Sequence, residues 1–165
     1  MSKYLAIKNN DIDNGEGLRV SVWFSGCPHK CRGCHNSESW DENVGKEFTD
    51  ETIEYIISLL NDVIKQDLSI LGGEPLAPYN INSTVKLVEE VKKRLPRTNI
   101  WLWTGYDLEE LNEESRLLLL NLDIDVIIDG RYSQSLHIDD KYRGSSNQRI
   151  LNHKESRKKE NYVFL

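Results

Sequence analysis

Residues 18–36 read LRVSVWFSGCPHKCRGCHN and join a strand pattern directly to a cluster of cysteines. The first eight residues, LRVSVWFS, mix β-branched and aromatic side chains in near alternation, which predicts a β-strand. The loop that follows holds Cys27, Cys31 and Cys34, which are all the cysteines of the chain. Three thiols leave one over after any single disulfide, and they leave one position open around a metal centre. The rest of the sequence must show whether the cysteines form a disulfide or bind a metal centre.

Composition limits the class of protein. The 165 residues are 38% apolar and 29% charged, which is typical of a soluble globular chain, so we expect a single domain spanning 1–165. The net charge of −6 gives no basic field for nucleic acid. The N-terminal segment lacks the pattern of a signal peptide, and no apolar run approaches the roughly 20 residues of a membrane span. We therefore expect a cytoplasmic protein with no nucleic-acid or membrane partner, in which clustered cysteines are metal ligands more often than disulfides.

Helix and strand patterns alternate after the cysteine loop. Apolar residues recur at helical spacing over 49–66, where Thr49 or Asp50 can cap the first turn, and Pro96 ends a later helix. The stretch from Tyr132 onward shows little periodicity beyond a possible strand at 161–165. The expected helices are 49–66, 83–95 and 108–120, with Asp107 and Glu110 forming a capping box, and the expected strands after the first are 68–71, 99–103 and 123–129.

This rhythm predicts an α/β fold of parallel strands joined by right-handed crossovers. In a parallel sheet or barrel, functional groups gather at the carboxyl ends of the strands. Here those ends are the cysteine loop and three short segments: GGEP at 72–75, TGY at 104–106 and DGRY at 129–132. We expect these four loops to converge on one face.

The cysteine spacing CxxxCxxC can direct three thiolates at one centre. Burial of three small apolar side chains is a poor explanation, because the neighbouring loop residues are polar and charged. Zinc is a serious alternative, since His35 could complete a Cys3His site with Cys27, Cys31 and Cys34. The other alternative is a 4Fe–4S cluster with three irons bound by cysteine and one iron open. Spacing alone leaves zinc and cluster equally open.

The GGEP segment favours the cluster, because an open iron needs a ligand and a ligand needs a pocket. Gly72 and Gly73 have no Cβ and would let a bound molecule approach the backbone closely. Glu74 offers a carboxylate to an ammonium group, and Pro75 restrains Glu74 to an extended conformation. Alone, GGEP is an ordinary strand-to-helix turn. Paired with the cysteine loop of the preceding strand, it indicates a ligand site that a structural zinc would not require.

At this point the chain resembles a known family. CxxxCxxC at the end of one strand and GGE at the end of the next are similar to the radical S-adenosylmethionine enzymes. Within them, CPHKCRGCHNSESW, GGEP, WLWTGY, DVIIDGRY and RGSSNQR, in this order between Asn14 and Arg149, resemble the activating proteins of anaerobic ribonucleoside-triphosphate reductases. The resemblance implies the minimal fold of that superfamily, a partial (βα) barrel of parallel strands with outer helices.

The resemblance also implies a chemistry. Cys27, Cys31 and Cys34 would hold a 4Fe–4S cluster whose open iron takes the amino and carboxylate groups of S-adenosyl-L-methionine. One electron, from a donor such as flavodoxin, would cleave the sulfonium to methionine and a 5′-deoxyadenosyl radical. That radical would abstract a hydrogen from a glycine of the reductase large subunit and leave a glycyl radical, with no catalytic side chain beyond cluster and cofactor. Two alternatives remain: an activase of another glycyl-radical enzyme of the formate-lyase type, and a non-catalytic binding module stapled by Cys3His zinc.

The resemblance assigns cofactor contacts residue by residue. The GGE segment would grip the methionine amino group. Many family members have an aromatic residue just before the third cysteine, where this chain has Gly33, which leaves His35 as a candidate to cover the cofactor. Thr104 could hydrogen-bond the ribose or carboxylate, and the polar loop 143–149 has no assigned role. The expected cofactor-binding residues are Gly33, Cys34, His35, Gly72, Gly73, Glu74 and Thr104.

Overall fold

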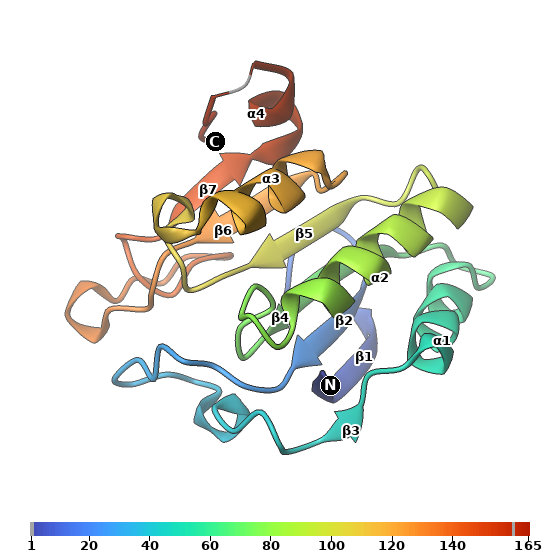
Figure 1. Ribbon diagram of the computed structural model, residues 1–165, viewed down its shortest axis with the longest axis horizontal. Coiled ribbons are helices and arrows are strands. Elements are labelled where there is room, and N and C mark those ends of the chain that lie inside the picture. Colours follow the sequence, from blue (N-terminus) through green and yellow to red (C-terminus); the bar gives the residue numbers. More distant parts are fainter. Residues whose placement is uncertain (1, 160) are drawn as a thin grey trace.

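The computed structural model describes residues 2–159 and 161–165, which form a seven-stranded mixed sheet with four α-helices in the described part (Figure 1). The order of strands in the sheet is β3-β1-β2-β4-β5-β6-β7. The strands are β1 (Lys3–Asp11), β2 (Arg19–Phe24), β3 (Lys46–Glu47), β4 (Asp67–Gly72), β5 (Ile100–Trp103), β6 (Val126–Asp129) and β7 (Arg149–Asn152). The helices are α1 (Asp50–Leu60), α2 (Ile81–Arg94), α3 (Glu113–Asn121) and α4 (His153–Lys159). The α/β class is confirmed.

The centre of the sheet is parallel and its edges are antiparallel. Strands β2, β4, β5 and β6 pair in parallel, as expected, with α1, α2 and α3 in the successive crossovers. The expectation of parallel strands is wrong at the edges, where β1 pairs antiparallel with β2, β3 with β1, and β7 with β6. Antiparallel neighbours need only a short connection, and 12–18 supplies one between β1 and β2. The closure of the sheet into a partial barrel stays a prediction.

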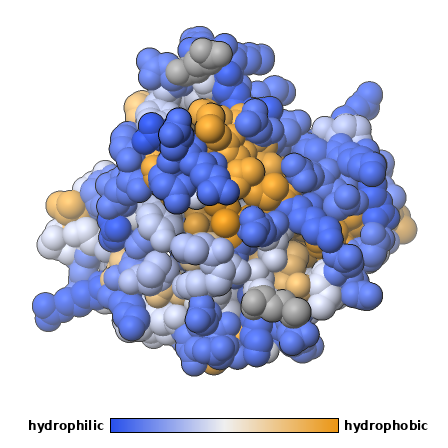
Figure 2. All heavy atoms as spheres, viewed as in Figure 1, coloured by the Kyte–Doolittle hydropathy of each residue, from blue (hydrophilic) through white to orange (hydrophobic). Residues whose placement is uncertain are grey.

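Both faces of the central strands are apolar. Ile100 and Leu102 of β5 face the main core beneath the helices, whereas the alternate residues Trp101 and Trp103 belong to a second cluster on the opposite face. Figure 1 shows α1, α2 and α3 lying over the first of these faces. On that side, Figure 2 shows a mainly hydrophilic surface with an apolar patch between α2 and α3. The helices therefore cover one face of the sheet and leave the ends of the strands available for a functional site.

The first helix is shorter than the expected 49–66. Its start is confirmed, because the Thr49 hydroxyl accepts a hydrogen bond from the backbone N–H of Thr52. The helix ends at Leu60, and Val63 and Ile64 are 97% and 66% exposed instead of continuing the apolar face. The Asp62 side chain accepts a hydrogen bond from the backbone N–H of Val63, a local contact that competes with helical pairing.

The expected helix 108–120 is two elements. The capping box of Asp107 and Glu110 is confirmed, but it begins a single 3-10 turn, Leu108–Glu110. A new N-cap at Asn112, whose side chain accepts from the backbone N–H of Ser115, then starts α3. The helix 83–95 is confirmed with the bounds of α2.

The last part of the chain is more ordered than its weak periodicity indicated. It contains a 3-10 turn (Gln134–Leu136), β7 and α4. The possible strand at 161–165 is reduced to an isolated bridge between Phe164 and Leu151. In the described residues no helix is both long and apolar enough to cross a membrane.

Candidate functional site

The four loops at the carboxyl ends of the parallel strands meet at one end of the sheet, as the sequence predicts (Figure 1). Hydrogen bonds join them. The Glu74 backbone N–H donates to the Gly26 carbonyl at 2.7 Å, which ties the loop after β4 to the cysteine loop. The Gly105 N–H, after β5, donates to the Glu74 carboxylate at 2.7 Å. All of these loops contribute to a single cavity.

The cavity has a volume of about 230 Å³ and brings the three thiols together with Gly72 and Gly73 at the end of β4. Cys27, Cys31 and Cys34 are free and half-buried. Burial raises the pKa of the Cys27 and Cys31 thiols, so both favour the protonated form until a cation binds. The residues that line the cavity are Cys27, His29, Cys31, Cys34, His35, Asn36, Leu71, Gly72, Gly73, Trp103, Thr104, Gly105, Gly130, Tyr132, Gly144 and Gln148.

The backbone of the cysteine loop reverses sharply to gather the thiols. Lys30 and Gly33 have left-handed backbone conformations, with φ of 49° and 78°. A Cβ at Gly33 would also lie 3.1 Å from the flexible Gln134 side chain, so the left-handed backbone is the main reason why glycine is favoured here. Gly33 does not line the cavity, and its expected contact with the cofactor stays a prediction.

The donor set fits an iron–sulfur cluster. A zinc ion needs four ligands within about 2.0–2.3 Å of one point. In residues 2–159 and 161–165, no three His, Cys, Asp or Glu side chains converge closely enough to hold a single metal ion. A four-iron cluster instead puts a different iron at each thiolate, and the three thiols here line one cavity. His35 lines the same space, with its ring 5.6 Å from that of Tyr132 between centroids.

The Glu74 carboxylate is fully buried and saturated by protein donors. Its Oε1 accepts from the Thr104 hydroxyl at 2.7 Å and from the Leu76 N–H at 2.9 Å. Its Oε2 accepts from the Gly105 N–H at 2.7 Å and from His29 Nε2 at 2.8 Å. Glu74 and the Thr104 hydroxyl, both expected to contact the cofactor, thus contact each other in this structure. Their cofactor contacts stay predictions.

Gly72 and Gly73 have a packing role in the protein that does not depend on a bound cofactor. A Cβ at Gly73 would lie 2.4 Å from the Gly26 carbonyl oxygen, and one at Gly72 would lie 2.6 Å from that of Phe24. These glycines therefore allow the end of β4 to pack tightly against the end of β2. Both also line the cavity, where the expected approach of a bound molecule is open to them.

The sequence did not reveal several cavity residues, among them His29, Tyr132 and Gln148. Gln148 belongs to the polar loop 143–149. Its Oε1 accepts from the Gly144 N–H at 2.8 Å, and its Nε2 donates to the Gly130 carbonyl at 3.0 Å. The polar groups of this loop thus build part of the cavity wall, and the signals in the sequence were the polar composition of 143–149 and its place among the family motifs.

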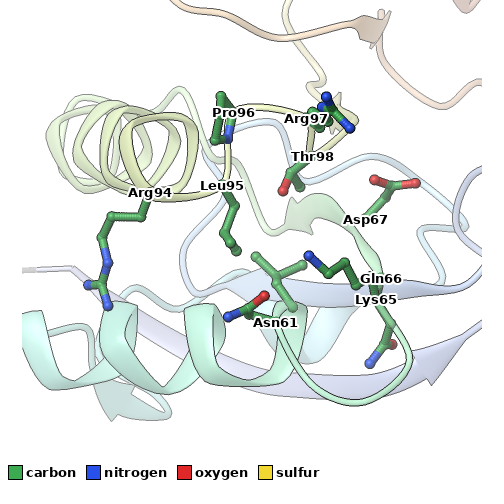
Figure 3. A pocket seen from close by; sticks show the side chains of 10 residues that line it. Asn61, Lys65, Gln66, Asp67, Arg94, Leu95, Pro96, Arg97 and Thr98 are labelled. Carbon is green, nitrogen blue, oxygen red and sulfur yellow. The ribbon is translucent and has the colours of Figure 1, made fainter.

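A second cavity, of about 390 Å³, lies at the amino ends of β4 and β5 (Figure 3). Leu95 and Pro96 give it an apolar side, and Lys65, Arg94 and Arg97 add cations. It has no thiol and is formed by the opposite ends of these strands from the cysteine cavity. Sites in parallel sheets gather at the carboxyl ends, so the cysteine cavity remains the candidate site.

Comparison with known proteins agrees with this chemistry. Residues 13–151 match the family described as 4Fe-4S single cluster domain. The anaerobic ribonucleoside-triphosphate reductase-activating protein of Haemophilus influenzae is 41% identical over 89% of this chain and 96% of its own length. Proteins of the same name from enterobacteria phage T4 and Escherichia coli K12 are each 41% identical, over 85% and 87% of this chain and 87% and 93% of their own lengths. The chain therefore belongs to the family of anaerobic ribonucleoside-triphosphate reductase-activating proteins.

Proposed function

We propose that this protein is a radical S-adenosylmethionine enzyme that installs a glycyl radical on the large subunit of an anaerobic ribonucleoside-triphosphate reductase. The observation that carries the proposal is the shared cavity, which the three free thiols line together with Gly72 and Gly73 at the end of β4. The family match to a 4Fe–4S domain and the names of the relatives support the same assignment. The partner in this proposal comes from those names.

Cys27, Cys31 and Cys34 would hold the 4Fe–4S cluster. A reduced cluster with S-adenosyl-L-methionine supplies, when both are bound, a one-electron cleavage to methionine and a 5′-deoxyadenosyl radical, which takes a hydrogen atom from glycine. The electron would come from an external donor such as flavodoxin. Each thiol must lose its proton when iron binds, and the burial that raises the pKa of Cys27 and Cys31 makes this proton loss depend on the metal.

The chain's own residues would bind and orient the cofactor. Gly72 and Gly73 border the cavity with bare backbone and would accept hydrogen bonds from the methionine ammonium through their carbonyls. The Glu74 carboxylate follows directly after them and adds negative charge on the same side. His35 and Thr104 border the cavity too, where the ring would cover the cofactor and exclude water.

The surroundings of the cavity support a macromolecular substrate. The cavity itself offers about 230 Å³, and the cluster and S-adenosyl-L-methionine would occupy it. A polar groove of about 560 Å³ adjoins it and shares Tyr132. A glycine-bearing segment of the reductase would enter from this side.

The experiment uses anaerobic protein reconstituted with iron and sulfide. Addition of dithionite and S-adenosylmethionine should yield methionine and 5′-deoxyadenosine in equal amounts. With the reductase present, electron paramagnetic resonance should show a glycine-centred signal on the reductase. A colourless protein that binds zinc in place of iron, or a brown protein that leaves S-adenosylmethionine intact, would contradict the proposal.

A further inference from the structure

His29 stands between the first two cysteines and points away from solvent. Its side chain is only 4% exposed. Its ring packs edge-on against Tyr106 at 4.5 Å between centroids. It also lies directly over the backbone of Gly105, where an added Cβ would come within 2.5 Å of the imidazole ring. A loop histidine that only met water would need none of these contacts.

Two hydrogen bonds fix the tautomer of this imidazole. The Arg131 Nε–H donates to His29 Nδ1 at 3.2 Å, and an arginine can only donate. His29 Nδ1 is therefore the acceptor, so Nε2 carries the proton and donates to Glu74 Oε2 at 2.8 Å. Outside the ring, Arg131 Nη1 pairs with Glu110 Oε1 at 3.0 Å. The result is a series of hydrogen bonds in which Arg131 donates to His29 and His29 donates to Glu74.

This series of hydrogen bonds reaches all four loops of the site. His29 belongs to the loop after β2, Glu74 to that after β4, and Arg131 to that after β6. The loop after β5 joins through the Thr104 hydroxyl and the Gly105 N–H, which both donate to Glu74. In the described residues His29 is the one side chain of the cysteine loop that hydrogen-bonds a side chain beyond that loop.

We propose that His29 is a positioning residue that locks the cysteine loop onto Glu74 and so sets the thiols relative to the glycines that face the cofactor. The cofactor part of this inference rests on the proposed function. In this arrangement the Glu74 carboxylate holds the cysteine loop in place. The backbone carbonyls of Gly72 and Gly73 would then accept the hydrogen bonds of the methionine ammonium. Both residues then act as one unit, so their removal should not have additive effects.

The first test follows loss of iron to a chelator from the reconstituted protein, without S-adenosylmethionine. His29→Leu and Glu74→Gln should each speed iron release by about 10-fold or more, as expected for loss of a hydrogen bond to a charged group. The double variant should release iron no faster than the faster single variant. His29→Gln, which can still place an amide donor near Glu74, should return the rate to within about threefold of the original protein.

Arg131→Gln provides a variant that leaves Glu74 untouched, and Arg94→Gln is its matched control. The two arginine side chains are 43% and 42% exposed, and each pairs with one carboxylate, but Arg94 lies at the other end of the sheet. Arg131→Gln should speed iron release, and it should weaken the change in the cluster's electron paramagnetic resonance spectrum on addition of S-adenosylmethionine. Arg94→Gln should change neither.

A double-mutant cycle that measures the melting temperature of the cluster-free protein is independent of the proposed function. Gly105→Ala should push against the imidazole and lower the melting temperature by several degrees. In a His29→Ala background the same change should cost less than half as much, because the ring is gone. Equal costs in both backgrounds, or additive iron release in the His29 and Glu74 variants, would overturn the inference. A wild-type protein that holds a cluster but ignores S-adenosylmethionine would instead reject the proposed function and leave the cycle interpretable.

Discussion

The substitution Gly73→Ala tests how tightly the end of β4 must pack against the end of β2. The new Cβ would lie 2.4 Å from the Gly26 carbonyl oxygen and 2.9 Å from that of Phe24. Both are backbone atoms, which cannot rotate away as a side chain can. The two strand ends must therefore separate, at the point where the Glu74 N–H donates to the same Gly26 carbonyl at 2.7 Å.

The magnitude follows from two contributions. Forcing a group into a filled space costs about 1–3 kcal/mol, and the hydrogen bond that is stretched contributes about 0.5–1.5 kcal/mol. We expect Gly73→Ala to lower the free energy of unfolding by about 1.5–4.5 kcal/mol. For a chain of this length, that is a fall in melting temperature of about 3–18 °C. Iron loading should fall as well, because the cysteine loop begins at the displaced strand end.

The assay is denaturant unfolding of the cluster-free, reduced protein, followed by iron content after reconstitution. Gly17→Ala is the matched control: its Cβ would meet no atom within 4 Å, but its φ of +76° is left-handed. It should cost only about 1–2 kcal/mol and leave iron loading unchanged. If Gly73→Ala keeps a free energy of unfolding within about 0.5 kcal/mol of the original protein and loads iron fully, the ends of β2 and β4 do not need this tight packing.

Three further predictions address the cluster, acid stability and a buried cation. Cys31→Ser should lose the brown colour and most of the iron after reconstitution, and full iron retention would contradict the ligand assignment. Burial alone would raise the pKa of Asp11, but hydrogen bonds from Asn14, Ser21 and the Asp13 N–H outweigh it and lower the pKa from 3.8 to about 2. The resulting stabilisation of about 2 kcal/mol should be present above pH about 4 and vanish as the pH falls to about 2, and acid titration of Asp11→Asn should lack this component. The Arg19 side chain is 1% exposed and donates hydrogen bonds to carbonyl and hydroxyl oxygens. The substitution Arg19→Met should therefore lower the free energy of unfolding by at least about 2 kcal/mol, and an unchanged stability would contradict the structural role of Arg19.

The sequence predicted the parallel centre of the fold because those strands are short apolar runs bounded by glycine and polar residues. It predicted too long a first helix, since Val63 and Ile64 continue the apolar spacing although the chain has already turned. It missed β1 and β7, which lie outside the parallel centre, because the segments 3–11 and 149–152 carry mixed polarity and show no clear strand pattern of their own.

The site was predictable where its residues are contiguous. The three cysteines lie within eight positions and GGEP fills four, so the cysteine spacing indicated a metal centre and the pairing of the two segments indicated a nearby pocket. The contact of His29 with Glu74 joins residues 45 positions apart, and the role of Arg131 depends on a second contact 102 positions away. Such contacts follow from the register of the sheet, which the sequence pattern did not specify.

The proposed function requires that this chain, with a 4Fe–4S cluster and S-adenosylmethionine, place a radical on the reductase. The most direct measurement is electron paramagnetic resonance of the reductase after anaerobic incubation with reconstituted protein, S-adenosylmethionine and a reductant. We expect a glycine-centred doublet that requires this protein and disappears when the reductase glycine is replaced by Ala. A doublet that forms without this protein, or none with an intact cluster and the matching reductase, would contradict the proposed function.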